Sequence, residues 1–375
     1  MAPWIPRMHL FEIDDQPWFP SFLRAHVQSG LTHAWTICIP ILQSCSPATL
    51  VANTLRRVLG KSVSAYTYID FCAGAGGPTP FIEQALNRQL ESDSPTTNNG
   101  GASSSSTAKN GKASFAAVAA AKPPDSNGRV KFIMTDLHPH ISSWEAASKK
   151  SEHLTYVPEP VDASNAPTGL IQQHTAAGKK VFRLFNLAFH HFDDDLARAI
   201  LKNTVETSDG FGIFELQDRT PSSFLSCTLF GVFVLLLAPY FYWWSPERLF
   251  FIYVLPVIPF VLVFDGIVSC LRTRTAAEVG HLLGTCGAST ANGDTGEWTV
   301  HHGREMFLWP IGYMTWIICT KDSEEDAKQD IISANMSASL DTGADTGLAS
   351  RKGKGKAAKE VSRTQNRGEP PKKVE

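Results

Sequence analysis

Short apolar runs alternate with amphipathic stretches along most of the chain. Apolar, β-branched and aromatic runs that end in turn residues predict buried strands, and apolar positions three or four residues apart predict helices. We expect strands at Ala65 to Phe71, Val130 to Met134, Val181 to Leu187 and Gly212 to Leu216. Helical spacing lies between them, at Thr79 to Leu90, Ser142 to Lys150 and Asp193 to Val205. The alternation predicts an α/β fold with a doubly wound, mainly parallel sheet covered by helices on both faces.

The ends of this domain follow from the same pattern. An aromatic and then helical stretch from Pro17 to Leu59 predicts two or three helices before the sheet, a helical cap over residues 1–60. Near the other end we expect one amphipathic helix at Asp265 to Leu283, and strands at Glu297 to His301 and Gly312 to Thr320. The catalytic domain therefore extends over residues 61–320.

Two uncharged runs interrupt this domain before its last strands. Phe224 to Tyr242 has 19 residues without a charge, close to the roughly 20 that an α-helix needs to cross a bilayer. Leu249 to Phe264 is shorter and contains two prolines, and Trp243 and Trp244 lie between the runs as interfacial aromatics would. A buried pair of core helices is the alternative. We expect a membrane hairpin at residues 224–264, with both ends on one side because the sheet continues after it.

Two further segments have the composition of disordered chain. Glu91 to Gly128 is rich in Ser, Thr, Asn, Gly, Ala and Lys with one aromatic residue, and it predicts a disordered insertion. The tail over residues 321–375 has no aromatic residue and includes a basic stretch that begins at Arg351. We expect this tail to be disordered as well.

Composition limits the partners and the compartment. The formal net charge of −2 and 19% charged residues give no general basic field, so we expect no nucleic-acid partner. The seven cysteines show neither CxxC pairs nor a disulfide framework, so we expect no metal site and a reducing compartment. The segment from Met1 to Glu12 lacks the order of a secretory signal. These features predict a membrane protein whose catalytic domain faces the cytosol.

A glycine-rich loop follows the first strand of the sheet. Asp70 ends the strand, Cys72 follows, and Gly74, Gly76 and Gly77 come next. Glycines allow a sharp turn and let the backbone approach a ligand without a Cβ in the way. The loop lacks the Lys and Ser or Thr that would bind a triphosphate. The loop could be a plain tight turn without a ligand. Further acids at the ends of the neighbouring strands would instead favour a loop that binds a nucleoside.

Two such acids follow. Asp136 ends the next strand, where a carboxylate can accept both ribose hydroxyls, although a helix cap is the alternative role. Asp162, before Ala163, comes at the spacing of a third strand end and suits an adenine amino group. Three acids at three successive strand ends indicate one nucleoside site.

These residues resemble the motifs of class I S-adenosylmethionine-dependent methyltransferases, as does the strand end Phe185-Asn186. The resemblance implies a Rossmann-like fold with seven strands and S-adenosyl-L-methionine as the cofactor. It implies that the glycine loop contacts the methionine part, that Asp136 binds the ribose, and that Asp162-Ala163 binds adenine. Cys72 replaces the first glycine of the usual pattern.

Three other segments resemble an uncharacterised membrane-associated methyltransferase-like subgroup of bacteria and fungi. They are Asp15 to Pro20, Phe185 to Phe192 and Asp265 to Arg272. The resemblance covers nearly the whole chain except the insertion and the tail. It implies that the paired hydrophobic runs belong to the enzyme, and it implies no particular substrate.

The catalytic candidates follow the fourth and fifth strands. His190 and His191 lie where doubly wound sheets bind ligands, and a histidine near its ordinary pKa could accept a proton from a hydroxyl or an amine. Both could instead brace the following helix. Glu215 could orient a histidine or a substrate cation, or pair with Arg219 or Arg272.

The sequence thus predicts methyl transfer from S-adenosylmethionine to a small, lipophilic or membrane-derived acceptor. Two alternatives remain open. One is a non-catalytic membrane-anchored scaffold, because no catalytic base is unambiguous. The other is an RNA methyltransferase, whose loop is similar to Asp70 to Gly77, although the catalytic Cys of that class is absent after the fourth strand.

Overall fold

A computed structural model describes residues 3, 5–93, 128–167, 169, 173, 175, 178–288 and 298–321. The predicted disorder of residues 94–127 and 322–375 therefore lies outside the described residues. Glu91 itself belongs to a helix, so the insertion begins later than expected.

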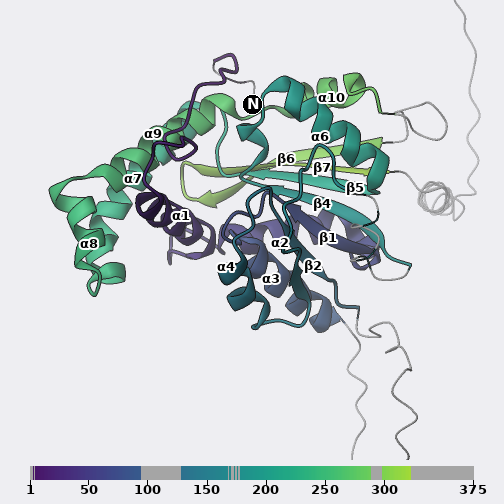
Figure 1. Ribbon diagram of the computed structural model, residues 1–375, viewed down its shortest axis with the longest axis horizontal. Helices are drawn as coiled ribbons and strands as arrows, with labels where there is room; N and C mark the ends of the chain where they lie inside the picture. The colour runs from purple at the N-terminus through teal and green to yellow at the C-terminus, as the bar shows by residue number, and fades with distance from the viewer. Residues whose placement is uncertain are drawn as a thin grey trace, which may run out of the picture. The chain divides into compact units, whose positions relative to one another are not determined.

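A seven-stranded mixed sheet forms the centre of the protein (Figure 1). Its strand order is β3-β2-β1-β4-β5-β7-β6. The strands are β1 (Tyr66–Phe71), β2 (Phe132–Thr135), β3 (Leu154–Tyr156), β4 (Lys180–Asn186), β5 (Gly210–Glu215), β6 (Trp298–Leu308) and β7 (Gly312–Lys321). The first five pair in parallel, and β7 runs antiparallel to both β5 and β6. The α/β fold is confirmed, with a sheet that is mixed rather than wholly parallel.

Helices cover both faces of the sheet, because successive side chains of a strand point to opposite faces. Ile69 and Phe71 pack in the core cluster that includes α6 (Asp194–Thr207) and α10 (Ala276–Thr285). Tyr68 packs in the cluster with α2 (Pro47–Leu59), α3 (Thr79–Asp93) and α4 (Ile141–Ser148). Two apolar cores therefore hold the strands of one sheet between two layers of helices.

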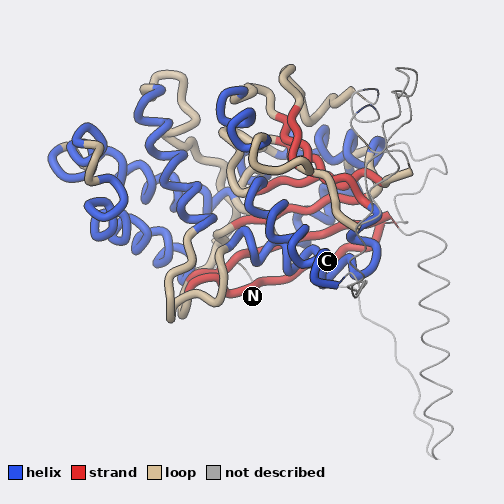
Figure 2. The backbone as a smooth tube through the Cα atoms, turned by 90° about the horizontal axis from the view of Figure 1, so that it is seen from below, coloured by secondary structure: helices blue, strands red, loops and turns tan. Residues whose placement is uncertain are grey.

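A third group of helices extends away from the sheet (Figures 1 and 2). It consists of α1 (Ser21–Thr36), α7 (Pro221–Tyr242), α8 (Pro246–Leu249), the π-helical turn η3 (Phe250–Val254) and α9 (Val257–Arg272). Helices α7 and α9 pack together as the arms of a helical hairpin, and α1 packs on α9. A Cβ added to Gly231 of α7 would lie 2.3 Å from Val263 Cγ2 of α9, so the two helices approach closely at this glycine.

By length and composition α7 could cross a membrane, with a mean hydropathy of 2.1 and only 17% of its apolar window buried. The second arm is bent by 65° between η3 and α9. The expected hydrophobic runs therefore form paired helices, and the bend falls at the residues around Pro256.

Three boundaries differ from the sequence prediction. The second hairpin arm does not end at Phe264, because α9 continues to Arg272 and takes in the first part of the helix expected from Asp265 to Leu283. The rest of that helix is α10, which Thr275 caps in a reciprocal capping box with Glu278. The third strand ends at Tyr156, so the expectation that Asp162 directly follows it is wrong. β6 continues to Leu308, well beyond the predicted end at His301, because it pairs with the whole length of β7.

Candidate active site

A cavity of about 800 Å³ lies at the carboxyl ends of β1, β2, β4 and β5. The chain reverses its direction of strand addition between β1 and β4, and open α/β sheets bind ligands at such a switch point. The glycine loop after β1 forms one wall. The opposite walls come from the N-terminal segment, α1, α7 and α9.

The glycine loop has the left-handed backbone that its composition predicts. Gly74, Gly76 and Gly77 have φ angles of 52°, 106° and 47°. Cys72 also has a positive φ of 71°, which is a strained conformation for a residue with a side chain. A Cβ on Gly74 would have no heavy atom within 4 Å, so its backbone faces open space. The loop can therefore approach a ligand directly.

Asp136 holds this loop in place. One carboxylate oxygen accepts the backbone N–H of Gly74 at 2.8 Å, and the other accepts the backbone N–H of His138 at 2.8 Å. On the other side of the loop, Trp144 Nε1 donates to the carbonyl oxygen of Gly74 at 2.9 Å. Asp136 lines the cavity and is partly exposed, so it has free acceptor capacity for a ligand's hydroxyl groups.

Asp70 and Asn186 supply buried acceptors beneath the loop. Thr79 Oγ1 donates to Asp70 Oδ2, and Asn186 Nδ2 donates to the same oxygen at 3.3 Å. Burial raises the pKa of Asp70 to about 7, although these two hydrogen bonds oppose the shift. Asp70 Oδ1 and Asn186 Oδ1 are buried and have no partner within the protein. Asn186 lines the cavity, whereas Asp70 lies behind it and braces the loop through Thr79 and Asn186.

Besides Asp70 and Gly76, three other predicted cofactor residues do not line the cavity. Asp162 is exposed, and its Oδ1 accepts from the backbone and hydroxyl of Ser164 in a local turn. Ala163 is buried, and its carbonyl oxygen accepts from Arg183 at 3.3 Å. Phe185 is fully buried in the core beside α6. The contact of Asp162 and Ala163 with adenine and the cofactor role of Phe185 stay predictions. Val161, whose N–H donates to the Asp136 carbonyl oxygen, connects the Asp162 loop to the site.

His190 and Glu215 form a buried pair on the far wall of the cavity. His190 lies in the short helix η2 (Phe189–His191), and its Nδ1 is 2.8 Å from Glu215 Oε2. Glu215 Oε1 accepts the backbone N–H of His190 at 3.2 Å, and Gln217 Nε2 donates to Glu215 Oε2 at 3.2 Å. A carboxylate beside Nδ1 favours the tautomer with the proton there. Nε2 is then the ring nitrogen that faces Glu12.

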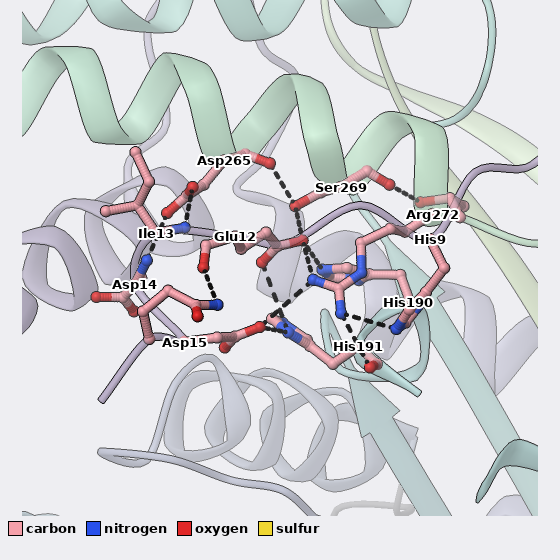
Figure 3. A network of polar contacts seen from close by, with 12 residues as sticks. His9, Glu12, Ile13, Asp14, Asp15, His190, His191, Asp265, Ser269 and Arg272 are labelled. Atoms are coloured by element: carbon pink, nitrogen blue, oxygen red, sulfur yellow. Dashed lines mark hydrogen bonds and ion pairs between the residues drawn. The ribbon is translucent and has the colours of Figure 1, made fainter. Parts of the chain in front are cut away.

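The N-terminal segment brings two more acids to the histidines (Figure 3). Glu12 Oε1 lies 3.6 Å from His190 Nε2, and Glu12 Oε2 lies 3.5 Å from His191 Nδ1. Asp15 Oδ2 is 3.0 Å from His191 Nδ1. Arg272 of α9 pairs with Glu12 at 3.0 Å and donates to the carbonyl oxygen of His191 at 3.1 Å.

Helix α9 fixes this segment. Asp265 accepts the backbone N–H of Ile13 at 2.7 Å and that of Asp14 at 2.9 Å, and Ser269 donates to Glu12 at 3.0 Å (Figure 3). The segment is therefore held over the cavity by the end of the hairpin that adjoins the sheet.

The ionic state of His191 follows from these neighbours. Burial lowers the pKa of His191, but the hydrogen bond to Asp15 and the negative charges of Glu12 and Asp15 outweigh burial and raise the pKa to about 9. Burial raises the pKa of Asp15, whereas His191 and Arg272 outweigh it and lower the pKa to about 2. His191 is therefore charged at neutral pH, and it forms an ion pair with Asp15.

Glu12, His190 and His191 also have ligand atoms within 4.8 Å of one another, close enough to hold a metal ion. The guanidinium of Arg272 already places a positive charge 3.0 Å from Glu12, and it would repel a metal cation. The positive charges of Arg272 and protonated His191 balance the negative charges of Glu12 and Asp15 without a metal ion. The sequence prediction of no metal stays a prediction.

Sequence reasoning missed Glu12, Gln217 and Ser269 as members of the site, and it assigned no role to Asp15. The only signal was local: acids within the aromatic segment before Pro17, and polar residues at a helical spacing of four in Asp265 and Ser269. Neither signal indicates that segments more than 170 residues apart meet.

No protein-family model matches the chain, and no curated protein matches it at a significant level. Solved structures are similar at low identity. The methyltransferase domain of bacterial CtHen1 is 11% identical, with 72% of this chain and 97% of that one covered and a TM-score of 0.34. PigF with SAH is 10% identical, with 80% and 69% covered and a TM-score of 0.32. A putative Zn-dependent alcohol dehydrogenase from Rhodobacter sphaeroides is 11% identical, with 74% and 98% covered and a TM-score of 0.32. The function has to be inferred from the chain's own site.

Proposed function

We propose that this protein transfers a methyl group from S-adenosyl-L-methionine to a lipophilic, membrane-derived acceptor. One observation carries the proposal: a single cavity joins the nucleoside-type loop of Gly74 and Asp136 to the buried His190–Glu215 pair. The left-handed backbone of the glycine loop supports the cofactor assignment, because at Gly74 it faces open space and can approach a ligand directly.

When bound, S-adenosylmethionine supplies an electrophilic methyl group on a sulfonium. Asp136 would accept hydrogen bonds from the ribose, and the loop backbone would contact the methionine part. His190 Nε2 would accept the proton that an acceptor hydroxyl loses as its oxygen bonds to the methyl carbon. Glu215 orients His190 and stabilises the imidazolium that results.

Apolar side chains on the outside of the hairpin support the membrane part of the proposal. Leu236 is 69% exposed and Tyr240 is 78% exposed on α7, and Val254 is 69% exposed on the second arm. Trp243 and Trp244 are exposed at the tip, as interfacial aromatics are. Exposed apolar side chains that gather on one part of a surface are typical of membrane or protein contact sites. We propose that the hairpin inserts into a bilayer and that the catalytic domain faces the cytosol.

Calorimetric titration of the full chain tests the cofactor assignment. We expect binding of S-adenosylmethionine and of its demethylated product, and no binding of NAD. Absence of binding by a folded protein would refute the assignment, and binding without transfer to any membrane lipid or quinone would favour the non-catalytic scaffold. Flotation with phospholipid vesicles tests the membrane part, and a protein that stays at the bottom of the gradient would refute insertion.

A further inference from the structure

The N-terminal strap, which we define as residues 5–16, covers the histidines of the site (Figure 3). It contains no helix or strand, and it crosses the last turns of α9, where the backbone N–H of Met8 donates to the carbonyl oxygen of Leu271 at 3.0 Å. Further along the strap, Asp265 of α9 accepts two backbone N–H groups. The second arm of the hairpin therefore holds the strap near both of its ends.

Glu12 of the strap lies where a substrate would have to approach His190. The His190 side chain is only 1% exposed, its Nδ1 faces Glu215, and its Nε2 faces Glu12 at 3.6 Å. Glu12 is itself buried, and it is held in place by Arg272 at 3.0 Å and by Ser269 at 3.0 Å. Because the imidazole is so deeply buried, a substrate hydroxyl reaches Nε2 only if Glu12 moves. The strap therefore has to shift before His190 can act.

The strap turns charged side chains toward the protein and large apolar side chains toward the outside. Two of its acids pair with Arg272 and His191, whereas Met8, Leu10 and Phe11 are 40%, 46% and 59% exposed. One exposed leucine is ordinary, but a neighbouring group of large apolar side chains indicates contact with a partner or a membrane. Transfer of one such side chain from water into an apolar phase is favoured roughly tenfold or more. The outer side of the strap therefore has a strong preference for an apolar phase.

These exposed side chains continue the apolar surface of the hairpin. The ring centroid of Phe11 lies 6.1 Å from that of Phe264 on α9, and the ring of Phe264 stacks on that of Phe260 at 5.9 Å. Phe260 is exposed. The apolar surface thus extends from the hairpin onto the strap, so a bilayer that takes up the hairpin also meets the apolar side of the strap.

We propose that the strap is a membrane-sensitive lid, which keeps His190 inaccessible in water and is displaced when its apolar side enters a lipid bilayer. Glu12 follows Phe11 directly in the chain, so transfer of Phe11 into lipid draws the Glu12 carboxylate away from His190. The site then opens at the surface that supplies a lipophilic acceptor. This inference rests on the membrane part of the proposed function, and its test does not depend on methyl transfer.

Chemical modification of His190 tests the inference. Diethyl pyrocarbonate reacts with accessible imidazole nitrogens, and mass spectrometry of the modified full chain identifies single histidines. We expect slow modification of His190 in buffer and, because uptake of Phe11 by lipid shifts the lid toward its open state, roughly tenfold faster modification with phosphatidylcholine vesicles. His153 is the control, because it is also buried but lies beside Arg129, outside the site cavity. Its modification should not change.

Variants of the strap and of its attachment sharpen the test. Phe11→Gln should return the modification of His190 on vesicles to nearly its rate in buffer, while the hairpin still holds the variant on the vesicles. Phe81→Gln is the matched control, because Phe81 is exposed on α3 rather than on the strap, and this variant should keep the vesicle effect. Asp265→Ala releases two backbone N–H groups of the strap, so His190 should react faster in buffer alone. If that variant does not fold, Ser269→Ala replaces it, because it removes one of the bonds that hold Glu12.

Flotation of the same samples distinguishes failure of this inference from failure of the proposed function. A protein that floats with the vesicles but whose His190 reacts no faster would overturn the lid alone. Equal acceleration at His190 and His153 would also overturn it, because it would indicate a general loosening of the fold. A protein that does not float would refute the membrane part of the proposed function and the lid with it. Faster modification of His190 without any methyl transfer would refute the proposed reaction and leave the lid.

Discussion

Removal of the Asp136 carboxylate tests the cofactor site most sharply. In Asp136→Ala the N–H of Gly74 loses a charged acceptor at 2.8 Å, and any ribose hydroxyl loses its charged partner. A hydrogen bond to a charged group contributes about 1.5–3 kcal/mol, and each 1.4 kcal/mol is tenfold in affinity. We therefore expect the Kd for S-adenosylmethionine to rise roughly 10- to 150-fold, measured by calorimetry on protein whose circular dichroism is unchanged.

Asp195→Ala is the control for this prediction. Asp195 is also an acid, but it is exposed, pairs with Arg198 and does not line the cavity. We expect the Kd to change less than about threefold, within the range of surface substitutions. An equal loss of affinity in both variants would show that the loss is not specific to the site, and unchanged affinity in Asp136→Ala would remove Asp136 from the site.

The remaining predictions concern catalysis, charge, packing and metal. Glu215→Gln keeps the shape of the site but weakens the orientation of His190, so we expect methyl transfer to fall about 100-fold with an unchanged cofactor Kd; an unchanged rate would exclude the pair from catalysis. Because the pKa of His191 is raised to about 9, its stabilisation is complete below pH 6.5 and is lost as the pH rises through 9. The free energy of unfolding, measured with urea at both ends of that window, should fall more in the native protein than in His191→Gln, and parallel profiles would contradict the ion pair. Gly231→Ala should lower stability by about 1–3 kcal/mol through the clash with Val263, whereas Gly280→Ala, with no atom within 4 Å of its Cβ, should not; equal melting temperatures would count against close packing of α7 and α9. Dialysis against EDTA should leave the methyl-transfer rate unchanged, and a loss that Mn²⁺ or Zn²⁺ restores would show that Glu12, His190 and His191 hold a metal.

Local patterns in the sequence were sufficient to predict the strands and the glycine loop. β1, β4, β5 and β7 are short apolar runs with clear turn signals, and each lies within one or two residues of the expected range. The glycines after β1 identify the turn because three of them take positive φ angles. These features depend only on residues that are close together in the sequence. A single sequence is therefore enough to predict them.

Features that depend on tertiary contacts could not be predicted in the same way. β3 is only three residues long, too short for a periodic signal, so the spacing of Asp162 was misread as a strand end. The break between α9 and α10 follows from the cap at Thr275, within a continuous amphipathic pattern. Glu12 reaches His190 only because Asp265 and Ser269 bind the N-terminal segment, and such long-range pairing leaves no periodic pattern in the sequence.

Transfer of a labelled methyl group to membrane lipid tests the central claim most directly. The full chain is incubated with methyl-tritiated S-adenosylmethionine and membranes, and the lipids are then extracted into organic solvent. We predict tritium in the lipid fraction with the native protein and, because His190 accepts the proton, about 100-fold less with His190→Gln. Tritium found only in water-soluble or RNA fractions, or equal labelling of lipid by both proteins, would contradict the account.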